Sequence, residues 1–66
     1  MNNIEIGKRL IKLRGNRTQE DVAKALNISV SAIGMYERGE RVPRDEVKLS
    51  LAKFYDTTVQ SIFYAE

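Results

Sequence analysis

Apolar residues recur along the chain at intervals of three and four positions, the spacing that gathers them on one face of an α-helix. Between about Ile4 and Arg14, for example, Ile6, Leu10 and Leu13 share such a face. No stretch alternates apolar and polar residues in the manner of a half-buried strand. The pattern therefore predicts an all-α fold.

Residues that favour helix ends divide the first half of the chain into three helices. Gly15 and Asn16 accept left-handed backbone angles and are expected to end the first helix. Thr18 and Asp21 have the spacing of a capping box, which predicts the start of a second helix. Ser29 is expected to cap a third helix.

Two further helices are expected after Pro43. The fourth covers about Arg44 to Tyr55, and Thr58 is expected to cap a short fifth helix. Their apolar residues are Val47, Leu51, Phe54 and Tyr55, with Leu49 and Ala52 at the edges, followed by Val59, Ile62 and Phe63. The predicted architecture is five short helices in a single domain of residues 1–66.

The composition limits the classes of protein to which the chain belongs. The hydrophobic fraction of 42% and the charged fraction of 30% are ordinary for a soluble globular domain. No apolar run approaches the roughly 18 residues of a membrane span. The absence of cysteine fits a cytoplasmic protein without proving that location.

Catalysis and metal binding are not expected. The chain has no cysteine and no histidine, so the usual transition-metal ligands, the commonest general base and a common nucleophile are missing. The four glycines are scattered and form no phosphate-binding loop. We therefore predict a protein that is not an enzyme, with no metal, no cofactor and no evident small-molecule ligand.

Basic residues are concentrated in two segments, although the net charge is only +2. The first segment holds five basic residues and no acid, namely Lys8, Arg9, Lys12, Arg14 and Arg17. The second, residues 38–44, holds three arginines and one acid, and no basic residue follows Asp56. This segregation indicates a basic face suited to nucleic acid, although solvated helix faces give the same pattern, and we expect Lys8, Arg9 and Lys12 to be solvated.

The segment from Thr18 to Arg38 has the arrangement of a helix-turn-helix, in which two short capped helices are joined by a tight turn. Asn27 and Ile28 form the turn, and Ile28 is expected to point inward. Ala23 is small and lets the two helices approach closely.

The second helix of this unit has two different sides. Ile33 and Tyr36 share the side that is expected to face the core. The opposite side is expected to contact base edges in the major groove. Its candidates for base contact are Val30, Ser31, Gly34 and Met35, with Gly34 allowing the backbone close to DNA. Packing against the preceding helix is the alternative for Val30.

The outer side of this helix carries no long amide or guanidinium near its start, so bidentate pairing with a base is not expected. Val30 and Met35 suit contact with thymine methyl groups, and Ser31 suits one hydrogen bond. We predict a readout of thymine methyls and DNA shape. Phosphate contacts should supply most of the affinity, and their candidates are Arg17, Gln19, Lys24, Arg38, Arg41 and Arg44.

These residues resemble the phage repressor and Cro-type helix-turn-helix family, also called XRE-like regulators. The resemblance is carried by Thr18 to Ala23, Leu26, Ile28, Ser29, Ile33, Tyr36 to Gly39 and Pro43, and it continues through Ala52, Thr58, Ile62 and Phe63. It implies a five-helix lambda-repressor-like fold and a regulator of transcription, usually a repressor, that binds double-stranded operator DNA.

The resemblance also implies roles for individual residues. It places base contacts at Val30, Ser31 and Met35, a phosphate contact at Gln19, and a structural ion pair between Arg14 and Glu37. The polar residue usual at the first base-contact position is replaced here by Val30, which leaves the preferred DNA sequence open.

Two functions remain open from the sequence. The first is a homodimeric regulator on a palindromic operator, with Val59, Ile62, Phe63 and Tyr64 divided between the monomer core and a twofold interface. The second is a protein-interaction role, such as an antitoxin or a regulatory partner, on the same fold. Salt-sensitive binding to DNA separates the two, because neutralising phosphates releases counterions.

Overall fold

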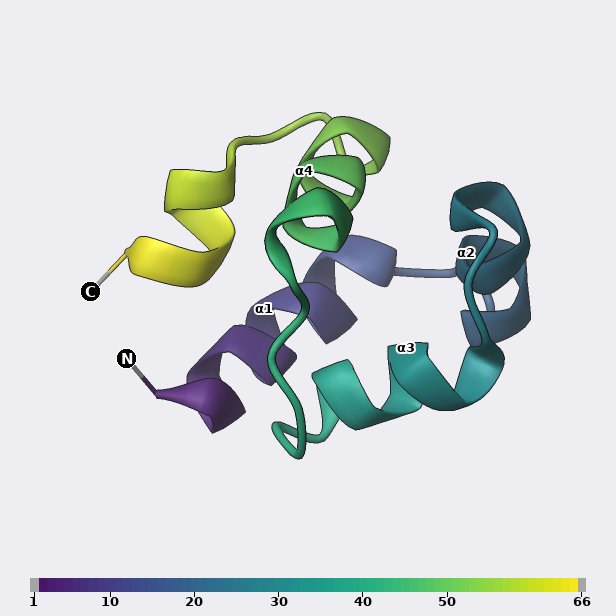
Figure 1. Cartoon of the computed structure of the whole chain (residues 1–66), viewed down its shortest axis with the longest axis horizontal. Helices are drawn as coiled ribbons and strands as arrows, with labels where there is room; N and C mark the ends of the chain where they lie inside the picture. The colour runs from purple at the N-terminus through teal and green to yellow at the C-terminus, as the bar shows by residue number, and fades with distance from the viewer. Residues whose placement is uncertain (1, 66) are drawn as a thin grey trace.

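The computed structural model describes residues 2–65, which form helices and no strand (Figure 1). The elements are α1 (Asn3–Arg14), α2 (Gln19–Leu26), α3 (Val30–Glu37), α4 (Asp45–Phe54) and the π-helical segment η1 (Gln60–Tyr64). The predicted all-α fold of five helices is confirmed. None of these helices is long and apolar enough to cross a membrane.

Side-chain caps fix where three of the helices begin. The Thr18 hydroxyl accepts a hydrogen bond from the Asp21 N–H at 3.0 Å, and the Asp21 carboxylate accepts one from the Thr18 N–H at 3.1 Å. This is the predicted capping box, and its hydrogen bonds with Thr18 lower the pKa of Asp21. Ser29 caps α3 as predicted, and Asn2 caps α1 at a position that the apolar pattern did not reveal.

Residues with positive φ end the first three helices. Gly15 follows α1 with φ 57°, Asn27 follows α2 with φ 56°, and Gly39 lies just beyond α3 with φ 75°. The prediction that Asn16 shares this geometry is wrong, because Asn16 is not among the residues with positive φ. Gly15 alone makes the reversal, since it has no Cβ to oppose it.

Each of the five helical elements contributes side chains to the apolar core. The buried core residues are Ile6, Leu10, Val22, Ala23, Ile33, Tyr36, Leu51, Ala52, Tyr55, Ile62 and Phe63. Burying a large apolar side chain contributes about 1.5–3 kcal/mol, so this core is the main source of stability. The expectation for Ala52 is corrected: it lies in the core beside Leu51 and not at the edge of α4, whereas Leu49 is exposed.

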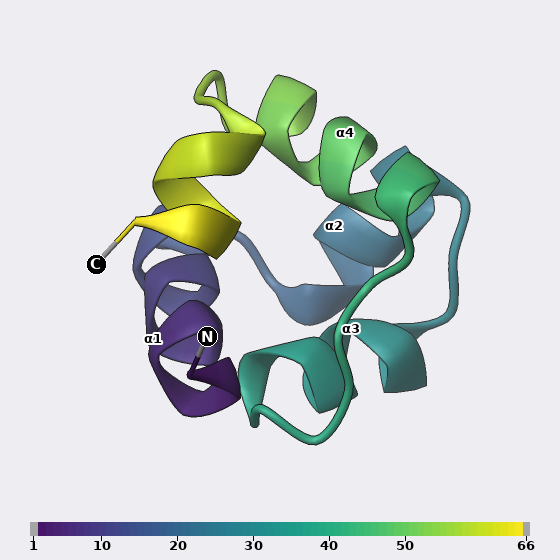
Figure 2. The same ribbon diagram turned by 60° about the vertical axis from the view of Figure 1, so that its left-hand side comes forward.

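The position of η1 shows which of the four residues divided between the core and a dimer interface belong to the core. Ile62 and Phe63 are each 1% exposed, because η1 packs against α1 and closes the monomer core with these two side chains (Figure 2). They are therefore not available to a partner. Val59 is partly buried and Tyr64 is exposed, so a dimer contact for these two residues stays a prediction.

Two cations from neighbouring helices hold η1 in place. Arg9 of α1 donates from its guanidinium to the carbonyl oxygens of Ile62 at 2.7 Å and Ala65 at 2.9 Å. Lys48 of α4 is buried and donates from Nζ to the Tyr64 hydroxyl at 3.0 Å. Arg9 is thus not simply solvated as expected, because it satisfies carbonyls that a final helical turn leaves without partners.

Gly7 allows α1 and α3 to pack closely. It is buried, and a Cβ atom at this position would overlap the backbone carbonyl of Glu37 at the end of α3. The same Cβ would also lie 3.1 Å from the carbonyl oxygen of Tyr36. Because the opposing atoms belong to backbone, they cannot move aside without shifting a helix.

We expect Gly7→Ala to lower the free energy of unfolding by about 1–3 kcal/mol, because the added methyl group forces α1 away from α3. Urea unfolding followed by far-ultraviolet circular dichroism measures this change. Gly34→Ala is the matched control in another helix. Its methyl would meet only the flexible Arg38 guanidinium, and alanine is favoured over glycine in helices by up to about 1 kcal/mol. An equal loss of stability in both variants would rule out this explanation.

Candidate nucleic-acid interface

The α2–α3 unit is built around a left-handed turn. Asn27 ends α2 in the left-handed region, and the Ile28 N–H donates to the Ala23 carbonyl at 3.0 Å. Ala23 is buried and Ile28 is partly buried against the core, as predicted. The turn therefore fixes the direction in which α3 leaves α2, and the two helices run in clearly different directions in Figure 1.

α3 lies at the edge of the molecule (Figures 1 and 2), and its residues divide into a buried and an exposed side. Ile33 and Tyr36 are 2% and 7% exposed, in agreement with the prediction that they face inward. Ser31 is exposed, and Val30 at the start of the helix is 42% exposed. This exposure leaves part of the Val30 side chain accessible at the surface.

Gly34 faces the outer side as predicted, but it does not lie open to solvent because the Arg38 side chain covers it. The residue is buried, and a Cβ at this position would lie 2.8 Å from a guanidinium nitrogen of Arg38. Arg38 follows Gly34 by four positions, so its long side chain folds back over the glycine. Met35 is half-buried beside it. The exposed part of the outer side is therefore centred on Val30 and Ser31.

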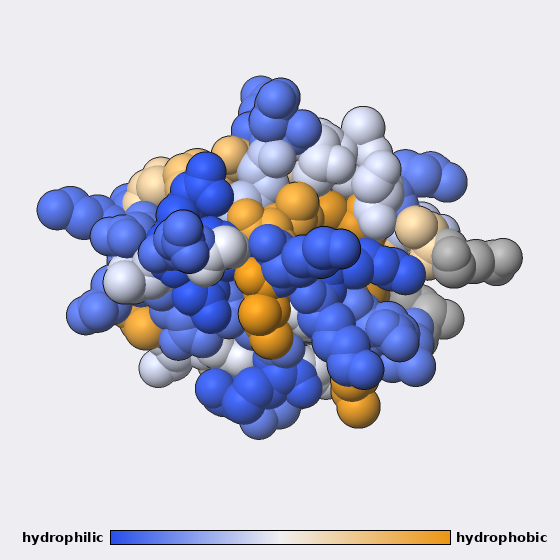
Figure 3. All heavy atoms as spheres, turned by 180° about the vertical axis from the view of Figure 1, so that it is seen from behind, coloured by the Kyte–Doolittle hydropathy of each residue, from blue (hydrophilic) through white to orange (hydrophobic). Residues whose placement is uncertain are grey.

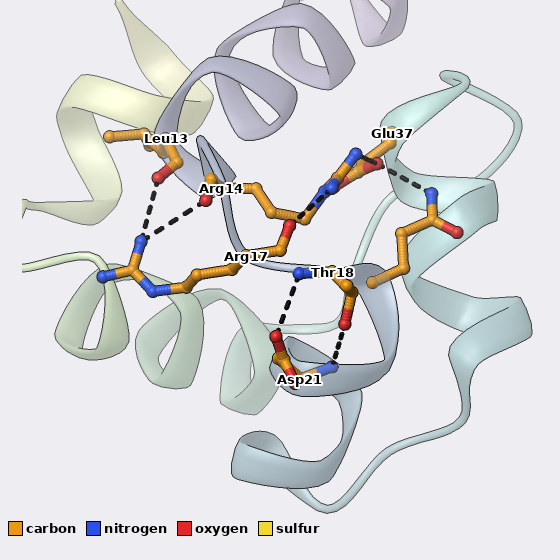
Figure 4. A network of polar contacts seen from close by, with 7 residues as sticks. Leu13, Arg14, Arg17, Thr18, Asp21 and Glu37 are labelled. Carbon is orange, nitrogen blue, oxygen red and sulfur yellow. Dashed lines mark hydrogen bonds and ion pairs between the residues drawn. The ribbon is translucent and has the colours of Figure 1, made fainter.

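The end of α3 is tied to α1 and α2 by a buried carboxylate (Figure 4). Glu37 has a side chain only 4% exposed, and it accepts hydrogen bonds from Arg14 Nε at 2.7 Å and Arg14 Nη2 at 3.2 Å. The predicted ion pair is therefore present, and its hydrogen bond raises the pKa of Arg14. Arg14 also donates to the Arg17 carbonyl at 2.7 Å, which fixes the loop between α1 and α2.

Gln19 belongs to the same network. Its amide nitrogen donates to the Glu37 carboxylate at 2.9 Å, so the side chain predicted to bind phosphate is held against the end of α3. Gln19 is the first residue of α2, where backbone N–H groups have no partners within the helix. These N–H groups are suited to an anion beside the α2–α3 unit.

Arg17 is directed away from this surface, in disagreement with its predicted phosphate contact. Its guanidinium lies over the Phe54 ring at 5.2 Å and near the Tyr55 ring at 5.9 Å. It also donates to the carbonyls of Leu13 and Arg14, and Figure 4 shows the side chain extending away from Glu37. The attraction between the cation and the aromatic ring of α4 accounts for this position.

The other predicted phosphate contacts differ in how they are held. Lys24, Arg41 and Arg44 are exposed, and Arg41 and Arg44 line a hollow that also contains Ser29 at the start of α3. Arg38 is exposed but forms an ion pair with Glu40, a partner that no sequence spacing indicated.

Seen from behind, the surface is mostly hydrophilic and has a short apolar strip near its centre (Figure 3).

Among residues 2–65, no three His, Cys, Asp or Glu side chains are grouped so as to hold a metal ion.

Comparison with known proteins bears directly on this arrangement. A family described as Helix-turn-helix matches residues 6–62, a range that includes the whole α2–α3 unit and the Glu37 network. A protein of Methanocaldococcus jannaschii, named an uncharacterized HTH-type transcriptional regulator, is 37% identical over 51 residues, which are 77% of this chain and 77% of that protein. No solved structure matches the chain significantly.

We expect Arg14→Gln to lower the free energy of unfolding by about 2–3 kcal/mol, because it leaves the buried Glu37 carboxylate without its cation. The partial exposure of Arg14 keeps this loss below that of a fully buried pair. Urea unfolding at neutral pH measures the change. Adding Glu37→Gln to this variant should restore part of the stability, because the stranded charge is then absent.

Arg38→Gln is the control for this measurement. It breaks an equally well-formed arginine–carboxylate pair whose side chains are 59% and 54% exposed. Exposed pairs contribute little, so the unfolding midpoint should not move measurably. If the two arginine variants lost equal stability, burial of Glu37 would not be the cause.

Proposed function

The chain belongs to the XRE-type helix-turn-helix family, and on this basis we propose that it is a sequence-specific DNA-binding repressor that reads a palindromic operator as a dimer. The division of α3 into a buried and an exposed side carries the proposal. Ile33 and Tyr36 anchor the helix in the core, while Val30 and Ser31 remain exposed at the edge of the molecule. A helix held in this way fits the major groove of B-form DNA.

The start of α3 reads the bases in this proposal. Val30 and Met35 contact thymine methyl groups, and Ser31 supplies one hydrogen bond. The two nearby side chains that are long enough to pair with a base already have partners within the protein, since Gln19 is bonded to Glu37 and Arg38 to Glu40. This supports the assignment of base reading to the shorter and apolar side chains. The base-reading surface is therefore small and mainly apolar.

Phosphate contacts come from both sides of the base-reading surface. Lys24 lies on α2, and Arg41 and Arg44 lie in the segment that joins α3 to α4. The backbone N–H groups at Gln19 add a contact without a net charge. These groups provide the part of the affinity that depends on salt and not on sequence.

The dimer in this proposal uses the exposed Tyr64 at the end of η1 together with the partly buried Val59, which directly precedes η1. A palindromic operator requires the two recognition helices of such a dimer to lie about 34 Å apart, one turn of DNA. Sedimentation of the free protein and of its complex with operator DNA tests this part. A strict monomer in both conditions would contradict it.

The first test is selection of bound sites from a random DNA pool, followed by affinity measurements between 50 and 200 mM salt. We expect affinity to fall steeply with salt, and Lys24→Ala or Arg44→Ala to weaken binding on every duplex and reduce the salt slope by about 0.9 per lost phosphate. Ser31→Ala and Met35→Ala should instead change the preferred sequence. Lys53→Ala, an exposed lysine at the far end of α4, is the charge-matched control.

The absence of salt-sensitive binding to any duplex would contradict the proposal and favour the protein-interaction role. Sequence-independent binding by the wild-type protein, with no effect of Ser31→Ala, would contradict the base-reading assignment alone.

Thymine-to-uracil replacement tests the methyl contacts separately. Each contacted methyl that is removed from the selected operator should weaken binding roughly fourfold, the equivalent of about 0.8 kcal/mol for one buried methyl group. The same replacement in a duplex bound by Val30→Ala should have a smaller effect at one position. Unchanged affinity after replacement of every thymine would contradict a methyl readout.

A further inference from the structure

The exposed end of α3 carries an arginine whose guanidinium is already occupied. Arg38 Nε lies 2.8 Å from one carboxylate oxygen of Glu40, and Arg38 Nη2 lies 3.3 Å from the other. Both side chains are more than half exposed. The pair is bidentate, with two parallel hydrogen bonds, and it occupies the edge of the guanidinium that carries Nε and Nη2.

The backbone brings this carboxylate to the recognition helix. Gly39 takes φ 75°, which reverses the chain directly after α3, and the Glu40 N–H then donates to the Met35 carbonyl at 2.9 Å. Glu40 is thereby fixed beside the last turn of α3. A Cβ on Gly34 would lie 2.8 Å from Arg38 Nη1, so the paired arginine covers the outer side of the helix that is assigned to DNA.

Stability does not explain such a pair, because exposed ion pairs contribute little to folding. The geometry of the pair instead resembles the bidentate contact that an arginine makes with a phosphate of DNA. A carboxylate and a phosphate both present two oxygens to the arginine fork, so Glu40 binds the same edge of the guanidinium that a phosphate can bind. The hydrogen bond between them raises the pKa of Arg38 and lowers the pKa of Glu40, as expected for a pair in which each charge stabilises the other.

We propose that Glu40 is an internal competitor for DNA, which holds the Nε and Nη2 edge of Arg38 in the free protein and must release this edge before a phosphate can bind it through two hydrogen bonds. This inference rests on the proposed function. Exchange of one anion for another adds little net affinity, and the released carboxylate then lies near the phosphate backbone and is repelled by it. Glu40 therefore lowers the sequence-independent part of the DNA affinity.

The variant Glu40→Gln removes the competitor and keeps the shape of the side chain. On the selected operator and on a scrambled duplex, fluorescence anisotropy should show binding about two- to fivefold tighter than that of the wild type. The salt slope should become steeper by up to about 0.9 for each protomer bound, because Arg38 then displaces a counterion and not a carboxylate.

Asp56→Asn is the matched control, since it also removes one negative charge. Asp56 is exposed in the turn after α4 and has φ 54°, a conformation that asparagine accepts. Its effect on DNA affinity should be smaller than that of Glu40→Gln. Equal effects of the two variants would overturn the inference, because net charge alone would then account for the gain.

A double-variant cycle separates competition from simple repulsion. In an Arg38→Gln background, Glu40→Gln should lose most of its effect, because no arginine remains to be released. A full gain in that background would overturn the inference. In the free protein, the pKa of the Glu40 carboxyl measured by NMR should rise when Arg38 is replaced, and an unchanged value would also overturn it. Failure of the wild type to bind any duplex would overturn the proposed function as well.

Discussion

The hydrogen-bonded ion pair of the buried Glu37 carboxylate is the interaction on which the arrangement of the first three helices depends. A charge that is 4% exposed requires a cation and further hydrogen bonds, and Arg14 and Gln19 supply them from α1 and α2. Three helices therefore meet at one group. Since Arg14 also binds the Arg17 carbonyl, the loop between α1 and α2 is fixed by the same requirement.

Close packing between the backbones of α1 and α3 contributes to the burial of this carboxylate. Gly7 brings α1 against the carbonyl of Glu37, so the last turn of α3 has no access to solvent on that side. The first turn of α3 is held instead by the Ser29 cap and the turn at Asn27. Because α3 is anchored at both ends, one of its sides is packed against the rest of the protein. The other side stays exposed at the edge of the molecule. The geometry suited to DNA is thus a consequence of how α3 is attached.

The sequence predicted the helices, their caps and the two sides of α3 because each depends on local spacing. Thr18, Ser29, Ile33 and Tyr36 all took their expected roles. It failed where the outcome depends on contacts between distant segments. Periodicity does not reveal that Arg38 folds over Gly34, and an apolar stretch as short as η1 does not indicate whether Ile62 and Phe63 face the core or a partner. The Arg14–Glu37 pair came from family resemblance and not from spacing.

The arginines illustrate why counting charges overstates the basic surface. Arg9 binds carbonyls of the last segment, Arg14 binds Glu37, Arg17 lies on Phe54, and Arg38 is paired with Glu40. The carboxylates neutralise Arg14 and Arg38 and so reduce the positive potential available to a phosphate backbone, whereas Arg9 and Arg17 keep their charge but have their guanidinium groups engaged elsewhere in the fold. Non-specific affinity is mostly electrostatic, so this arrangement lowers binding to random DNA more than it lowers contacts with base edges. For the base-reading surface proposed above, arginines that are satisfied within the fold would lower the sequence-independent background against which one DNA sequence is distinguished from another.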